Sequence, residues 1–236
     1  MLLFNNPDDL RCVWVYSCGM KTLRLLGLFA SGALICMAAD KPAQSEPLAT
    51  WVDPTDPAIA AIRLLGETVT GRADHTMVYE IERAVDEKGL VGAVDHIHLK
   101  QQALPKSEPG QPRVTALKLT SQVLRNPANR PDAAEQAALD LIKKAIHDGT
   151  EVPAILVQRL ETPAAPTEWR VYRPISTRPI CLKCHGPLAE IDPEVRAKLA
   201  VNYPEDKAKD YAVYTWRGII RTSLAVPVPA AATGAK

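Results

Sequence analysis

Five consecutive residues, Cys181-Leu-Lys-Cys184-His185, constrain this chain more than any other feature. Two thiols three positions apart can each form a thioether with one vinyl group of a haem, and the adjacent histidine then reaches the iron as an axial ligand. Thioredoxin-type pairs and zinc sites also use two such cysteines. However, the chain has no second CxxC and no HxxxH pair, and no aromatic residue precedes Cys181. The motif therefore predicts one covalent haem c.

The amino-terminal segment has the order of a secretory leader. The letters MKTLR are followed by an apolar run at 25–35 and small residues at 38–39, as in a signal peptide. We expect a leader over 1–39, with the signal peptide at 20–39 and an upstream extension, from a start assigned too early, at 1–19. The body would then be periplasmic. It would contact a membrane only if the leader stayed uncleaved, because an apolar run of about 11 residues is short for a bilayer span.

Composition places the remaining chain among ordinary globular domains. Apolar residues make up 47% of the sequence, which is enough for the core of one domain. The formal net charge is +1 and aromatic residues make up 5% of the sequence. The chain thus has neither the excess of basic residues nor the aromatic residues for base stacking that would indicate a nucleic-acid partner. No cysteine other than the motif pair follows residue 39, which argues against a disulfide framework. We expect a linker over 40–55 and one domain over 56–230.

Periodicity along the body predicts helices and strands in a mixed order. Apolar residues recur at helical spacing in four segments, and shorter alternating or apolar runs predict strands. The expected helices are 56–70, 76–87, 132–146 and 188–201, and the expected strands are 114–123, 154–160, 169–174 and 217–226. Gly89 is a natural end for the second helix. Helices come first and short connections join the later strands, which favours an α+β fold with an antiparallel sheet.

Three sequence blocks resemble a known family, the c-type haem proteins with a PAS-like fold, which occur as periplasmic proteins and as sensor domains. The blocks are LRNPANRPDAAE at 124–135, YRPISTRPICLKCHG at 172–186 and YPEDKAKDYAVYTWRGIIRTSLAV at 203–226, the last with Asp210 where glycine is usual. The resemblance implies a PAS-like antiparallel sheet of about five strands flanked by helices, with N-terminal helices and the haem in the PAS-like pocket.

The same resemblance implies where the sixth iron ligand comes from, since in that family it can be a cysteine ahead of the first block. Residues 92–100 occupy this region and hold no cysteine; Ile97 stands near its place, between His96 and His98. Imidazole is a common strong iron ligand. Residues two apart on a helix project in different directions, so only one histidine is expected to bind. We favour His98, with His96 as the alternative, unless the sixth position is open.

Two arginines and a methionine complete the candidate residues. Arg125 and Arg217 could pair with the haem propionates, because guanidinium groups bind carboxylates in a forked geometry. Alternatively, Arg125 supports its loop and Arg217 faces water. Met77 is the only methionine after residue 37 and it precedes the motif. A small cytochrome c with a methionine ligand downstream of its motif is therefore a poor match, and nothing in the sequence around Met77 supports ligation.

Two kinds of function are compatible with these residues. The first is a redox or ligand-responsive haem module, which would take a diatomic gas as ligand and act on a separate redox or signalling partner protein. The alternative is a periplasmic electron-transfer carrier with bis-His ligation. An enzyme is not expected, because six-coordinate iron offers no vacant position, and peroxidase-like activity would require an open sixth site.

Overall fold

A five-stranded antiparallel sheet lies at the centre of the structure, a computed structural model that describes residues 47–96, 104–106, 108–163 and 165–227. The strands are β1 (Leu48–Val52), β2 (Arg113–Thr120), β3 (Leu156–Thr162), β4 (Ala165–Ser176) and β5 (Trp216–Ala225). Their order is β1-β3-β4-β5-β2, and all neighbours are antiparallel. The expected α+β class with an antiparallel sheet flanked by helices is confirmed.

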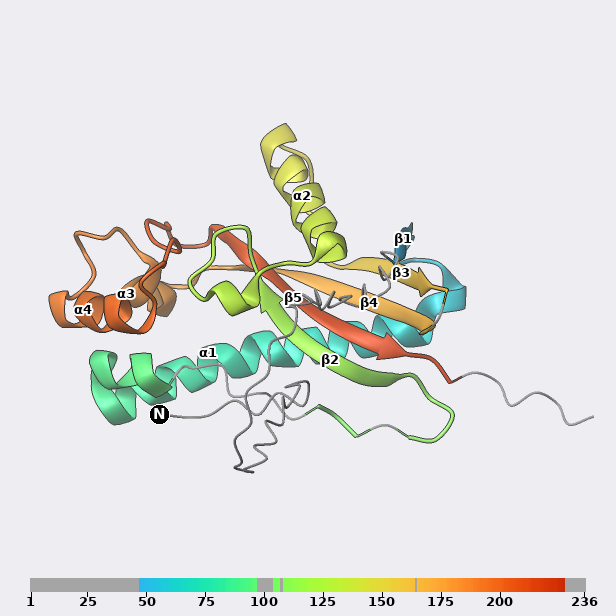
Figure 1. Cartoon of the computed structure of the whole chain (residues 1–236), viewed down its shortest axis with the longest axis horizontal. Helices are drawn as coiled ribbons and strands as arrows, with labels where there is room; N and C mark the ends of the chain where they lie inside the picture. The colour runs from blue at the N-terminus through green and yellow to red at the C-terminus, as the bar shows by residue number, and fades with distance from the viewer. Residues whose placement is uncertain (1–46, 97–103, 107, 164, 228–236) are drawn as a thin grey trace, which may run out of the picture. The chain divides into compact units, whose positions relative to one another are not determined.

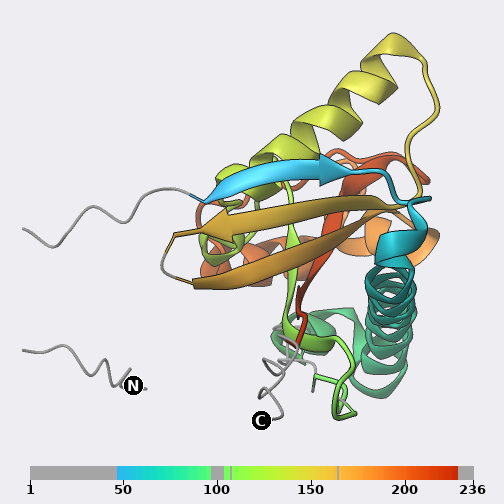
Figure 2. The ribbon, with the colours of Figure 1, turned by 90° about the vertical axis from the view of Figure 1, so that its right-hand side faces the viewer.

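Helices cover both faces of this sheet (Figure 1, Figure 2). The long helix α1 (Ala60–His96) lies along one face, and α2 (Ala133–Asp148) rises from the other. Two short helices, α3 (Leu182–His185) and α4 (Pro193–Asn202), lie beyond one end of the sheet, beside the last turns of α1 (Figure 1). Three 3-10 turns complete the elements: η1 (Pro57–Ile59), η2 (Pro127–Asn129) and η3 (Pro179–Cys181).

The sheet divides the apolar core into two layers. Alternation along a strand sends neighbouring side chains to opposite faces. On β4, Val171 packs with Ile62 under α1, whereas Tyr172 packs with Leu139 and Ile142 under α2. In the described part of the chain, no helix is both long enough and apolar enough to cross a membrane.

The first helix is continuous where the sequence predicts two. We expect helices at 56–70 and 76–87, but α1 passes through the intervening residues without interruption, so the predicted break is wrong. Small residues in this stretch reflect close packing instead of a turn, since Ala73 is buried against Ile175 of the sheet. Gly89 does interrupt the helix, with φ 70° and ψ 172°, a conformation that glycine adopts without strain.

A strand lies where the sequence predicts a linker. Residues 48–52 form β1, which pairs with β3 from Leu48 opposite Glu161 to Val52 opposite Val157. The prediction of a linker over 40–55 is therefore wrong for these residues. β1 is a mostly exposed edge strand, so its side chains carry no alternating apolar signal, and pairing with β3 defines it. The expected leader, 1–39, lies outside the described residues.

Buried charges fix the start of α2 on the sheet. Asp132 and Glu135 form a reciprocal capping box at the helix N-terminus. The fully buried Glu135 carboxylate also accepts from Arg221 Nε at 3.0 Å and Lys118 Nζ at 2.6 Å. Arg170 Nη1 binds both Asp132 oxygens, at 2.9 and 2.7 Å. A carboxylate buried as completely as that of Glu135 is stable only when it is paired, so the first sequence block determines where α2 meets the sheet.

Candidate functional site

A cavity of about 210 Å³ lies at the end of the sheet where α1, α3 and α4 meet. Its wall is largely apolar and comes from elements far apart in the chain. The described residues that line it are Met77, Ile81, Val94, Leu119, Thr120, Ser121, Leu124, Arg125, Asn126, Asn129, Ile175, Ser176, Thr177, Ile180, Cys181, Cys184, His185, Leu199, Tyr203 and Arg217. Cys181, Cys184 and His185 of the CxxCH motif therefore all line the same cavity.

The two motif cysteines enter the cavity from one helical turn. Cys181 ends η3 and Cys184 lies in α3. Residues three apart lie on the same side of a helix, so the local fold presents both sulfurs to the same space. Both thiols are free. Burial raises the pKa of the Cys184 thiol, which keeps it protonated at neutral pH.

The motif histidine is held in the form that ligates metals. Nδ1 of His185 lies 2.7 Å from the carbonyl oxygen of Ala208. A carbonyl only accepts, so Nδ1 carries the proton and Nε2 keeps its lone pair. Desolvation by burial, followed by the nearby guanidinium of Arg125, lowers the pKa of His185 to about 3, and the ring is neutral. Within the described residues, Nε2 has no hydrogen-bond partner and His185 lines the cavity. Such an oriented, neutral imidazole is a ready iron ligand.

Arg125 and Asp206 hold the backbone around this histidine. Arg125 Nε lies 3.0 Å from Asp206 Oδ2, and the two side chains are only 14% and 4% exposed. Arg125 Nη2 also donates to the carbonyl of Cys184 and, at 3.4 Å, to that of Ala208. Asp206 Oδ1 accepts from the Ala208 N–H at 2.8 Å. Through Ala208, Asp206 therefore supports the hydrogen bond to His185, a role that nothing in the sequence indicates.

The structure separates the two arginine candidates. Arg125 is committed to Asp206 and to carbonyls, as in the alternative that it supports its loop. Arg217 donates to the Val123 carbonyl at 3.1 Å and lies 5.2 Å from the Tyr211 ring centroid. Among the described residues, no carboxylate forms an ion pair with it. Burial, with Arg125 nearby, lowers the pKa of Arg217, so an anion at the cavity would be favourable there.

The loop after α4 closes against the motif through backbone bonds. The Tyr211 N–H donates to the His185 carbonyl and the Asp210 N–H to the Gly186 carbonyl, both at 2.9 Å. Asp210 has φ 63°, in the left-handed region. Glycine is the usual residue for this conformation and aspartate is among the few others that tolerate it. Aspartate therefore fits the backbone at this position, where the resemblance leads us to expect glycine, and its carboxylate also caps the Leu188 N–H at 3.0 Å.

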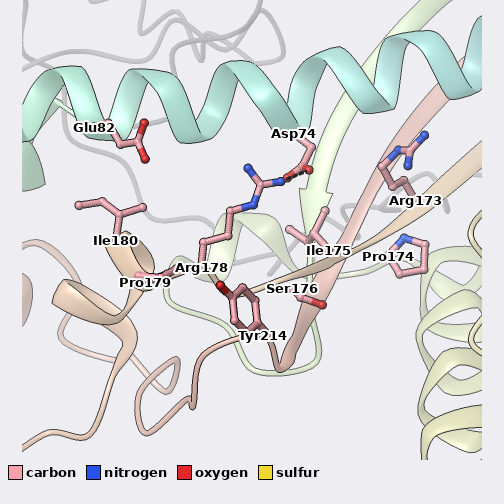
Figure 3. Close-up of a pocket in the computed structure, with 10 residues that line it drawn as sticks. All are labelled: Asp74, Glu82, Arg173, Pro174, Ile175, Ser176, Arg178, Pro179, Ile180 and Tyr214. Atoms are coloured by element: carbon pink, nitrogen blue, oxygen red, sulfur yellow. Dashed lines mark hydrogen bonds and ion pairs between the residues drawn. The ribbon is translucent and has the colours of Figure 1, made fainter.

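An ion pair ties the segment ahead of the motif to α1. Arg178 Nη2 lies 2.5 Å from Asp74 Oδ2. Figure 3 shows the Arg178 side chain reaching across a surface pocket to the helix, with Ile180 beside it and Tyr214 below. Thr177, one residue earlier, donates through Oγ1 to the Ala212 carbonyl at 2.6 Å. The segment that precedes Cys181 is thus held both by α1 and by the loop after α4.

The candidates for the sixth iron ligand do not all lie where the sequence analysis expects them. His98 lies outside the described residues. His96 ends α1 with Nδ1 2.9 Å from Lys88 Nζ, and it is not among the residues that line the cavity. Met77, for which the sequence offered no context, does line it. Only the fold reveals this, since Met77 and His185 are more than a hundred positions apart.

The residues present fit the haem c that the motif predicts. Two thiols one helical turn apart, a neutral imidazole and Arg217, which has no carboxylate partner among the described residues, line a largely apolar space. Fold and site thus define a class: an α+β domain whose end cavity carries the groups needed for covalent haem attachment.

Comparison with known proteins assigns the family. A sequence profile of the Tll0287-like family matches residues 96–225, more than half of the chain, and the chain belongs to that family. The first two sequence blocks, the motif and all but the last residue of the third block lie inside the matched range. Among solved structures, it is similar to the cyanobacterial heme-protein Tll0287, with 17% identity and a TM-score of 0.38, over 68% of this chain and 94% of that one. No curated protein matches.

Proposed function

We propose that this chain is an exported c-type haem protein that holds one haem through Cys181 and Cys184, with His185 as an axial ligand. The observation that supports this proposal most directly is that Cys181, Cys184 and His185 line one cavity, and that the hydrogen bond from His185 Nδ1 to a carbonyl leaves Nε2 unprotonated. When bound, the haem supplies an iron that exchanges one electron and can take a small ligand. Tll0287, which gives the family its name, is described as a heme-protein, and the proposal extends that property to this chain.

The chain's own residues would orient and tune the group. The Ala208 carbonyl keeps the His185 ring in one tautomer, and Arg125 with Asp206 keeps that carbonyl in place. A hydrogen bond from the ring N–H to a carbonyl held in this way raises the basicity of a ligating imidazole. Arg217 would compensate a propionate, since it is the cavity arginine without a carboxylate partner among the described residues.

The role that we propose is a redox or ligand-responsive haem module in a PAS-like domain of the periplasm. A change of iron state would act on a separate partner protein, and no catalytic turnover is expected. The alternative, a periplasmic electron-transfer carrier, requires two firm protein ligands that small molecules do not displace.

Covalent attachment is tested by changing both motif cysteines. The wild type and the Cys181→Ala, Cys184→Ala double variant would be produced with their leader in a host that matures cytochromes c. We expect haem to remain with the denatured wild-type chain and to be absent from the denatured double variant. Full covalent haem in the variant, or none in the wild type, would refute the proposal. Fractionation of the same cells tests export.

The role is tested with carbon monoxide. Spectra of the purified protein are recorded in the oxidised and reduced states, with and without CO. A reduced spectrum that shifts promptly with CO supports the ligand-responsive module. A low-spin reduced spectrum that does not change when CO is added supports the electron carrier instead.

A further inference from the structure

We propose that Met77 supplies the sixth ligand of the iron through its thioether sulfur, opposite His185. This inference rests on the proposed haem function and deepens it. Its starting point is placement: Met77 on α1 and His185 on α3 line the same cavity, together with both motif cysteines. A ligand on each side of the iron requires donors from different walls, and these two come from different elements.

The packing places Met77 and the motif in different apolar clusters. Met77 packs against the cluster of Ala73, Ile175 and Ile220, where α1 meets the sheet. Cys184 packs against the cluster that includes Val94 and Leu199, where α1 meets α4. The cavity adjoins both clusters, because it is lined by members of each. Met77 is thus on the sheet side of the cavity and the attachment turn is on the α4 side.

Few described side chains in the cavity wall carry an atom that ligates haem iron. Outside the motif they are Met77 and Tyr203, since thioether and phenolate are both known axial ligands. Tyr203 packs in the same cluster as Cys184, on the attachment side. Burial raises the pKa of its phenol, which disfavours the phenolate. His96 lies against Lys88 and is not in the described wall. Among the described residues, Met77 is the donor that remains.

The helix makes Met77 a well-placed donor. Residues four apart share a helix face. Ala73, one turn earlier, is 4% exposed against the sheet, and Ile81, one turn later, lines the cavity. Met77 therefore lies between the part of this α1 face that contacts the sheet and the part that lines the cavity. Its unbranched side chain has three rotatable bonds and can adjust the sulfur position without moving the backbone.

The ligand type has consequences that can be measured. Methionine with histidine raises the haem reduction potential relative to two histidines. A thioether is also displaced more readily than an imidazole, because it is the weaker donor. His/Met ligation would thus favour a ligand-responsive module over a firmly bis-His carrier.

The test compares the full-length wild type with Met77→Leu, which keeps the size and apolar character but removes the sulfur. Leu65→Ile, on the same helix but outside the described cavity wall, is the matched control. We expect all three to retain covalent haem after denaturation. Met77→Leu should lose the far-red thioether absorption of the ferric form, become high-spin when reduced, and bind CO at least about tenfold more tightly, since no internal ligand competes. Leu65→Ile should match the wild type. Met77→His should restore a low-spin spectrum at a lower potential.

A Met77→Leu protein with the wild-type spectrum, potential and CO affinity would overturn the inference while leaving covalent haem intact. The same spectral change produced by His98→Ala, and not by Met77→Leu, would also overturn it. Loss of covalent haem from the wild type itself would refute the proposed function. The two failures are therefore distinguishable.

Discussion

The ion pair between Arg125 and Asp206 provides a quantitative test of how the histidine is held. Asp206→Asn keeps the side-chain shape but removes the charge from a pair whose members are 14% and 4% exposed. It leaves the Arg125 guanidinium without its carboxylate beside the cavity. Breaking a buried pair by removing one partner costs about 3 kcal/mol or more. For a urea slope of about 1–3 kcal/mol/M, the unfolding midpoint should fall by about 1–3 M.

The assay is urea unfolding of the haem-loaded protein at neutral pH, with the reduction potential as a second readout. Glu161→Gln is the control, because its ion pair with Arg159 is 44–46% exposed. Exposed pairs contribute at most about 1 kcal/mol. We also expect Asp206→Asn to change the potential, since the hydrogen bond to His185 loses support, and Glu161→Gln to leave it unchanged. Equal unfolding midpoints for the two variants would refute the reasoning.

Three further predictions concern packing, pH and the propionate site. Gly218→Ala should destabilise the protein by about 1–3 kcal/mol in thermal or urea unfolding, because the added Cβ would lie 2.4 Å from the Thr120 carbonyl oxygen; wild-type stability would contradict this. Burial opposes ionisation of Asp132 and Glu168, but hydrogen bonds, including those from Arg170 on β4, outweigh it. The pKa of Asp132 is therefore lowered below its usual 3.8 and that of Glu168 below its usual 4.5. Their contribution to stability is therefore complete above about pH 5 and lost as the pH falls through the lowered values. Acid titrations should show this decline, and a flatter one in Asp132→Asn. Arg217→Met should lower the reduction potential by roughly 50–100 mV, the scale of a unit charge in a partly buried site; an unchanged potential would argue against a role near the haem.

Local sequence determined much of the fold and the attachment turn. Asp132 and Glu135 mark the start of α2, and Gly89 marks the interruption of α1, because caps and left-handed residues act over one helical turn. The spacing of Cys181 and Cys184 is likewise a local property. The order of helices and strands was enough to predict the α+β class.

The tertiary structure decided which distant residues serve the motif. Arg125 and Asp206 are 81 positions apart and meet only because the loop after β2 packs against the loop after α4. Met77 has no local signal either; it enters the cavity because α1 lies against the sheet. β1 exists as a strand only through its pairing with β3. Such contacts depend on how elements pack in three dimensions, whereas spacing along a chain reports only on neighbours within a turn or a strand.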